Sequence, residues 1–112
     1  MIEVSVQDVG NAKVLSITGD VDLYSSPEVR KELMALTDQK VKNILVDLNK
    51  VSYMDSSGVA TLVEGLQQIG KYKGKLALFG LHSVVKEVFE LSRLDKVFDI
   101  YPDQDSALEK LS

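Results

Sequence analysis

Short apolar runs alternate along this chain with longer segments in which apolar residues recur every three or four positions. The runs NILVDLN at residues 43–49 and KLALFG at residues 75–80 are nearly all apolar, which is typical of strands covered on both faces. The segment between them places its apolar side chains at helical spacing: Val59, Leu62, Val63, Leu66 and Ile69. Such alternation predicts an α/β fold whose sheet is parallel at its centre.

The flanking segments extend this pattern to the order β-β-α-β-α-β-α-β-α. The first two strands, residues 2–9 and 12–19, are predicted to form a hairpin around a Gly-Asn turn, which adds one antiparallel pairing. The buried face of the first strand is expected to hold Ile2, Val4 and Val6. We therefore expect one domain over residues 1–112, a mixed sheet flanked by about four helices.

The helices carry start signals and apolar stripes. SSPEVRKELMAL at residues 25–36 predicts a helix capped by Ser26 and opened by Pro27. Its buried stripe is expected to be Val29, Leu33 and Leu36. The later segments predict a helix, a strand and a closing helix at residues 83–94, 97–101 and 103–111. The stripe of the first of these is expected to be Val85, Val88, Phe89 and Leu91.

Charge and cysteine content exclude several kinds of partner. The net charge is −4 with acids and bases interspersed, whereas duplex nucleic acid requires clustered Lys and Arg. The cluster Lys71, Lys73 and Lys75 is interpreted as a solvated turn. No cysteine is present, and no segment approaches the roughly 20 apolar residues of a membrane span. We expect a cytoplasmic protein with no cofactor, bound metal, nucleic acid or membrane partner.

Polar residues gather where the predicted parallel strands end. GDVDLYSS follows the second strand and MDSSGV follows the third, so Asp20, Asp22 and Asp55 are expected on one rim of the sheet. Asp47 lies within its strand and is expected to lie apart from them. Functional sites of α/β sheets collect at this edge, which makes these two loops the candidate site.

Ser56 and Ser57 stand at the predicted start of the second helix. Helix capping alone explains one of the polar residues in this stretch, because Asp and Ser are favoured at N-caps. One residue is enough for the cap, so a second hydroxyl in the first turn is left facing solvent. A phosphate on that hydroxyl would meet the positive end of the helix dipole, which the fold can accept.

Serine hydrolysis is disfavoured by the residues around this doublet. The hydrolase motif G-x-S-x-G requires glycine two positions before the serine, where this chain has Met54. His82 is the only histidine, and it is expected to cap or flank the third helix. We therefore expect that the protein is not an enzyme.

An aspartyl phosphoacceptor of the receiver type is a second interpretation. Asp20 and Asp22 imitate the paired acids with which receiver domains hold a divalent metal. However, this pair follows the second strand, and no lysine stands at the end of the last strand. A turn between strand and helix accounts for both aspartates equally well.

Three stretches resemble the STAS-domain anti-sigma factor antagonists of bacterial partner-switching systems. GDVDLYSSPEVRKEL is similar to the first signature of that family, and NILVDLNKVSYMDSSGVATL to its second, an apolar strand running into M-D-S-S-G. VVKEVFELSRLDKVFDIYPDQDSAL is similar to its C-terminal stretch. The chain departs from the common pattern at Tyr53, where phenylalanine is frequent, and at Val59 and Ala60.

The resemblance implies a phosphorylation switch. The second serine of the doublet, Ser57, would be phosphorylated by an anti-sigma factor that is a serine kinase with a histidine-kinase-like ATPase fold. The unphosphorylated form would bind this kinase and free the sigma factor, and a metal-dependent serine phosphatase would reset the switch. The free protein is expected to be a monomer. The expected partner surface comprises Asp20, Asp22, Tyr24, Ser25, Asp55, Ser56, Ser57 and Gly58. A STAS scaffold that is never phosphorylated is the remaining alternative.

Overall fold

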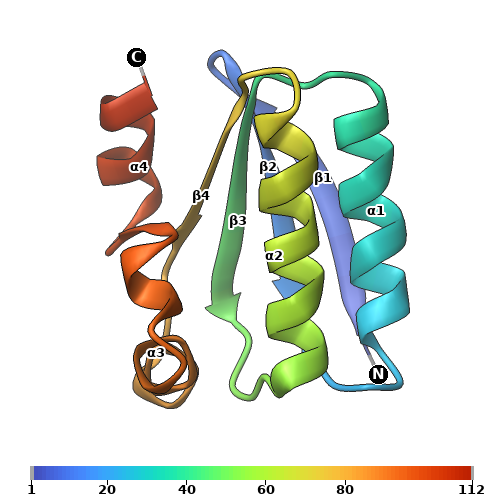
Figure 1. Cartoon of the computed structure of the whole chain (residues 1–112). Helices are drawn as coiled ribbons and strands as arrows, with labels where there is room; N and C mark the ends of the chain where they lie inside the picture. Colours follow the sequence, from blue (N-terminus) through green and yellow to red (C-terminus); the bar gives the residue numbers. More distant parts are fainter. Residues whose placement is uncertain (1, 112) are drawn as a thin grey trace.

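Five strands form one sheet in the order β1-β2-β3-β4-β5 in the computed structural model, which describes residues 2–111 (Figure 1). β1 pairs with β2 in antiparallel fashion, and the other neighbours are parallel. The strands are β1 (Glu3–Val9), β2 (Ala12–Thr18), β3 (Asn43–Lys50), β4 (Lys75–Phe79) and β5 (Asp99–Tyr101). The helices are α1 (Ser26–Asp38), α2 (Ser56–Gly70), α3 (Ser83–Leu91) and α4 (Gln104–Leu111), with a 3₁₀ turn at Leu94–Lys96. The predicted mixed sheet and element order are confirmed.

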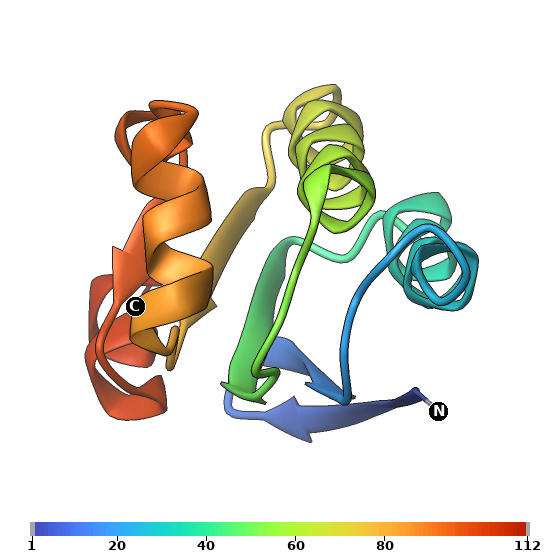
Figure 2. The same ribbon diagram turned by 90° about the horizontal axis from the view of Figure 1, so that it is seen from below.

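The helices cover the two faces of the sheet unequally. Parallel strands that follow one another in sequence order place their right-handed crossover helices on one face, so α1, α2 and α3 share a layer. Figure 2 shows α1 and α2 side by side on that face. α4 packs on the opposite face through Ala107. The central strand alternates accordingly: Ile44, Val46 and Leu48 face the three-helix layer, and Leu45 faces α4.

The opening hairpin forms as predicted, with one difference in its buried face. Gly10 has φ +61°, a conformation that glycine adopts without strain, and it turns β1 into β2. Ile2 and Val4 pack against the core, but Val6 is 41% exposed. β1 is an edge strand, so the helix layer covers only one part of it.

The start of α1 and the end of α3 differ from the sequence prediction. α1 begins at Ser26 with Ser25 as its N-cap residue, so the helix starts one residue earlier than the predicted cap implies. α3 ends at Leu91, whose side chain is 78% exposed and does not join the buried stripe. The chain turns away at Arg93, whose φ of 63° lies in the left-handed region. Phe98 then packs edge-on against Phe89, with 5.5 Å between the ring centroids. Among residues 2–111, no helix is both long and apolar enough to traverse a bilayer.

Candidate functional site

The loops that follow β2 and β3 remain paired beyond the sheet. The N–H of Val21 donates to the carbonyl of Tyr53 at 3.0 Å, and the N–H of Asp55 donates to the carbonyl of Val21 at 3.0 Å. These bonds hold the segment that carries Asp20 and Asp22 alongside the segment that carries Asp55. The predicted rim therefore exists, at the lower end of the molecule in Figure 1.

Asp55 caps α2. Its Oδ1 accepts the N–H of Ser57 at 2.8 Å and the N–H of Gly58 at 3.3 Å, which satisfies two of the unpaired donors at the helix start. Ser56 and Ser57 are therefore the first two helical residues, and neither hydroxyl is needed for the cap.

The hydroxyl of Ser57 is free and reaches solvent. Its Oγ forms no hydrogen bond with any residue in the described range 2–111. Every fully buried side-chain oxygen in that range does have a hydrogen-bond partner. Ser57 Oγ is therefore not enclosed, although the residue as a whole is half-buried. The backbone around it is held on both sides, because Thr61 Oγ1 also donates to the Ser57 carbonyl at 3.1 Å. The site thus presents an unbonded hydroxyl from a fixed backbone.

Gly58 allows α2 to approach the paired loops closely. It is buried, and a Cβ at this position would lie 2.7 Å from both Met54 Cγ and Val21 Cγ1. Val21 and Met54 form a β-bridge directly beneath the first turn of the helix. Gly58 was predicted to belong to a contact surface, and in this structure it lies under that surface and sets the position of Ser57.

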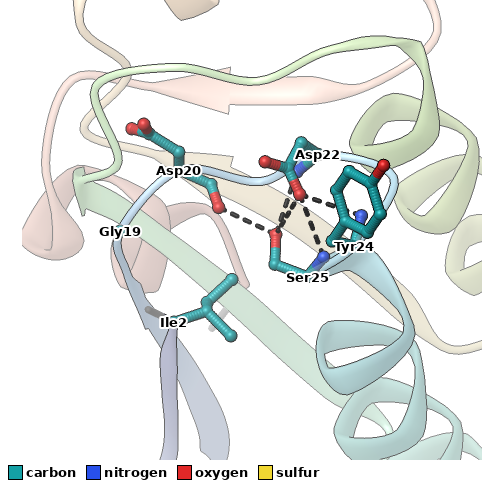
Figure 3. A pocket seen from close by; sticks show the side chains of 6 residues that line it. All are labelled: Ile2, Gly19, Asp20, Asp22, Tyr24 and Ser25. Atoms are coloured by element: carbon teal, nitrogen blue, oxygen red, sulfur yellow. Dashed lines mark hydrogen bonds between the residues drawn. The ribbon is translucent and has the colours of Figure 1, made fainter.

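The segment between β2 and α1 is folded around the carboxylate of Asp22 (Figure 3). Its Oδ1 accepts the N–H of Tyr24 at 2.9 Å and the N–H of Ser25 at 3.0 Å. These N–H donors, of which that of Ser25 has the largest effect, hold the pKa of Asp22 below its ordinary value. Ser25 Oγ in turn lies 2.8 Å from the Asp20 carbonyl and accepts the Asp22 N–H at 2.9 Å. Asp22 and Ser25 therefore shape the loop.

Asp20, Leu23 and Tyr24 are the exposed members of this loop. A cavity of about 530 Å³ opens beside Asp20 and Tyr24, lined also by Ile2, Gly19, Asp22 and Ser25 (Figure 3). Tyr24 is 91% exposed, and Asp20 accepts a hydrogen bond from Ser52 Oγ at 3.1 Å. Sequence reasoning missed Ser52, which ties the two loops together through their side chains.

The aspartates of the rim are engaged in loop contacts rather than arranged as a metal site. Asp22 Oδ1 already accepts two backbone N–H groups, and Asp20 accepts from Ser52. Within residues 2–111, no group of three or more His, Cys, Asp or Glu side chains is placed to hold a metal ion. Asp47 lies within β3, where its neighbours are Ser16 and Asn49.

His82 lies at the neighbouring strand end and does not face the serines. It is the N-cap residue of α3, next to the first helical residue as predicted, and its Nε2 contacts the carbonyl oxygen of Asn49. No base of this type is therefore hydrogen-bonded to Ser56 or Ser57.

Comparison with known proteins gives one consistent family. Residues 3–107 match the STAS domain. The chain is 32% identical over 99 residues to the anti-sigma-B factor antagonist of Bacillus subtilis strain 168, covering 88% of this chain and 90% of that protein. A crystal structure of an anti-sigma factor antagonist from Mycobacterium paratuberculosis matches with a TM-score of 0.91 at 25% identity, covering 98% of this chain and 93% of that one.

The same fold is found in a more distant structure. The Bacillus cell fate determinant SpoIIAA in its phosphorylated form matches with a TM-score of 0.76 at 19% identity, covering 98% of this chain and 100% of that one. The family match spans both signature stretches, the rim and α2. The chain therefore belongs to the STAS domain family and is similar along most of its length to anti-sigma factor antagonists.

Proposed function

We propose that this protein is an anti-sigma factor antagonist that is switched by phosphorylation of Ser57. Its unphosphorylated form binds an anti-sigma serine kinase of the histidine-kinase-like ATPase fold, and the sigma factor is thereby released. Phosphorylation by that kinase ends the binding, and a metal-dependent serine phosphatase restores it. The protein is a binding partner and phosphate acceptor in the cytoplasm, without catalytic activity of its own.

The free hydroxyl of Ser57 is the observation that carries this proposal. Asp55 takes the capping role, so the Ser57 hydroxyl can be modified without loss of a hydrogen bond that holds α2. A phosphate there adds about −1.5 to −2 charges beside the carboxylate of Asp55. The scaffold can tolerate this group because it stands at the positive end of a helix of 15 residues.

The surrounding rim suits a basic partner surface. Asp20, Tyr24 and Ser56 are exposed on the same rim as Ser57. The carboxylates of this rim, Asp20, Asp22 and Asp55, would steer a basic groove toward the hydroxyl. Asp22 and Ser25 hold the loop in place, while Gly58 and Asp55 hold the start of α2. Once phosphate occupies this contact, a loss of about 3 kcal/mol weakens binding about 100-fold.

The relatives support the same conclusion. The protein from Bacillus subtilis that shares 32% of its residues with this chain is named an anti-sigma-B factor antagonist. SpoIIAA, which has the same fold, is known in both an unphosphorylated and a phosphorylated form. A phosphorylation switch on this scaffold is thus in keeping with its neighbours.

Labelling with the kinase tests the proposal. An ATPase-fold anti-sigma kinase from the same genome is incubated with ATP and either wild type, Ser56→Ala or Ser57→Ala, and phosphate is located by mass spectrometry. We expect one phosphate on Ser57 in the wild type and in Ser56→Ala, and none in Ser57→Ala. Labelling of Ser56, equal labelling of Ser57→Ala, or an acid-labile phosphate on an aspartate would contradict the assignment.

A further inference from the structure

Five lysines gather at the end of the molecule opposite the phosphorylation site. Two lie in the loop after α1, two in the loop after α2, and one is the first residue of β4, all at the top of Figure 1. All five are exposed. We call this surface the lysine face; it comprises Lys40, Lys42, Lys71, Lys73 and Lys75.

The two loops form one surface because they are bonded to each other. The N–H of Lys75 donates to the carbonyl of Lys42 at 2.7 Å, and Tyr72 Oη donates to the carbonyl of Val41 at 2.6 Å. Lys40 Nζ also lies 5.5 Å from the centre of the Tyr72 ring. Lysines about 30 positions apart in the sequence are thereby held on one face. The sequence interpretation considered only the second loop and predicted a solvated turn.

The charge of this face is not neutralised. Within residues 2–111, the ion pairs are Lys13 with Asp8 and Arg30 with Glu64, so no lysine of the face pairs with a carboxylate. Asp38 is the only acid in the two segments 38–42 and 70–75. The helix dipole favours cations close to a helix C-terminus, and the effect falls off within about one turn. It therefore accounts for Lys40 and Lys71, which lie next to the ends of α1 and α2, and less for the other three lysines.

Two of these lysines occupy backbone positions that favour glycine. Lys40 has φ 59° and Lys73 has φ 62°, both in the left-handed region. Lys40 follows the C-cap residue of α1, a place where glycine is common because it adopts this conformation without strain. A lysine at each of these positions costs stability, which points to a role for its charge rather than for the turn.

We infer that the lysine face contacts anionic lipid headgroups at a membrane surface. Two adjoining loops at one end of the molecule offer their charges to a flat surface, and none of these lysines lines the cavity beside Asp20 and Tyr24. Clusters of four to eight lysines favour such surfaces, with each lysine strengthening binding about fivefold. The contact is electrostatic and reversible, without an inserted segment, and it departs from the sequence-based expectation of no membrane partner.

The negative net charge of −4 does not prevent this contact. α2 has 15 residues, so its length of about 22 Å separates the lysine face from Asp55 and the rest of the acidic rim. The Debye length at physiological salt is about 8 Å, so the membrane responds to the lysines and hardly to the distant acids. Ser57 then faces away from the membrane, so this inference does not depend on the proposed phosphorylation.

Vesicle sedimentation tests the inference. The full chain is mixed with vesicles of phosphatidylcholine containing about one-third phosphatidylglycerol, or with phosphatidylcholine alone, at low and high salt. We expect binding to the anionic vesicles only, weakened by salt. The variant K71Q/K73Q/K75Q should bind about 100-fold more weakly. The control K31Q/K86Q/K96Q has the same net charge and three exposed lysines replaced elsewhere, and it should lose less than about threefold.

Several results would overturn the membrane assignment. One is equal binding to both kinds of vesicle, and another is an equal loss in the two triple variants. A third is binding of the wild type to an RNA oligonucleotide but not to vesicles. Lys73→Gly distinguishes the role of the charge from that of the turn. This variant should unfold at the same or a higher temperature than wild type, yet bind the vesicles about fivefold more weakly. A destabilised Lys73→Gly would show instead that the lysine serves the turn.

Discussion

Asp55 Oδ1 accepts the backbone N–H of Ser57 at 2.8 Å, so the residue that caps α2 also fixes the proposed phosphate acceptor. The carboxylate bonds the backbone of the acceptor and leaves its hydroxyl free. A phosphate can therefore change what the surface binds while the helix start stays in place. This separation of roles allows stability and switching to be tested with different substitutions.

Replacing the cap should destabilise the fold. Asp55→Ala removes the acceptor for two backbone N–H groups and should lower the free energy of unfolding by about 1 kcal/mol. Asp55→Asn keeps an oxygen acceptor and should stay within about 0.5 kcal/mol of wild type. Urea denaturation measures the free energy of unfolding of both variants. If Asp55→Ala unfolds at the wild-type urea concentration, Asp55 does not act as the cap.

The close approach at Gly58 gives a second prediction. Gly58→Ala puts a Cβ 2.7 Å from Met54 Cγ and Val21 Cγ1, which should cost about 1–3 kcal/mol of stability although alanine favours helices. Gly70→Ala is the control in the same helix, because a Cβ there meets nothing within 4 Å. Thermal unfolding should rank Gly70→Ala at or above wild type and Gly58→Ala below it. The reverse order would show that the first turn is not tightly packed.

Most of the fold follows from the sequence because each strand and helix carries its own period. The strands 43–49 and 75–80 and the stripe of α2 were predicted from local patterns, and those patterns agree with the tertiary arrangement. The errors fall where a local pattern meets a boundary. Leu91 continues the helical spacing of α3, but the helix ends there and the side chain lies outside the core.

The packing around α3 can be tested through this difference. Phe89 is fully buried against Phe98, so Phe89→Ala should lower the free energy of unfolding by about 3–5 kcal/mol. Leu91 is 78% exposed, so Leu91→Ala should change it by less than about 0.5 kcal/mol. Denaturant unfolding of the two variants compares them directly. A large loss of stability in Leu91→Ala would show that Leu91 belongs to the buried stripe, as the sequence predicted.

The lowered pKa of Asp22 predicts a pH dependence of stability. Its folded pKa lies below its unfolded value of about 3.9, because the N–H groups of Ser25 and Tyr24 favour the carboxylate. The stabilisation is therefore complete above about pH 5 and is lost as the pH falls through the folded pKa. Urea unfolding from pH 7 to pH 2.5 should show wild type losing stability relative to Asp22→Asn. A difference in unfolding free energy between the two proteins that stays constant with pH would contradict this role of Asp22.

The candidate site was predicted less completely than the fold. The rim and the doublet could be read from the strand ends, because parallel strands bring their carboxyl ends together. The sequence could not show which polar residue caps α2, because Asp55, Ser56 and Ser57 are all acceptable cap residues and only the geometry distinguishes them. The bond from Ser52 to Asp20 and the lysine face depend on residues about 30 positions apart, whose pairing no local pattern reveals.

Affinity for the partner kinase, measured by titration calorimetry with and without phosphate on Ser57, tests the central claim most directly. The chain is prepared with phosphoserine at position 57, and thermal unfolding confirms that both forms are folded. We predict that the phosphorylated form binds at least about 100-fold more weakly, at an unchanged unfolding temperature. Equal affinities of the two folded forms would contradict the account.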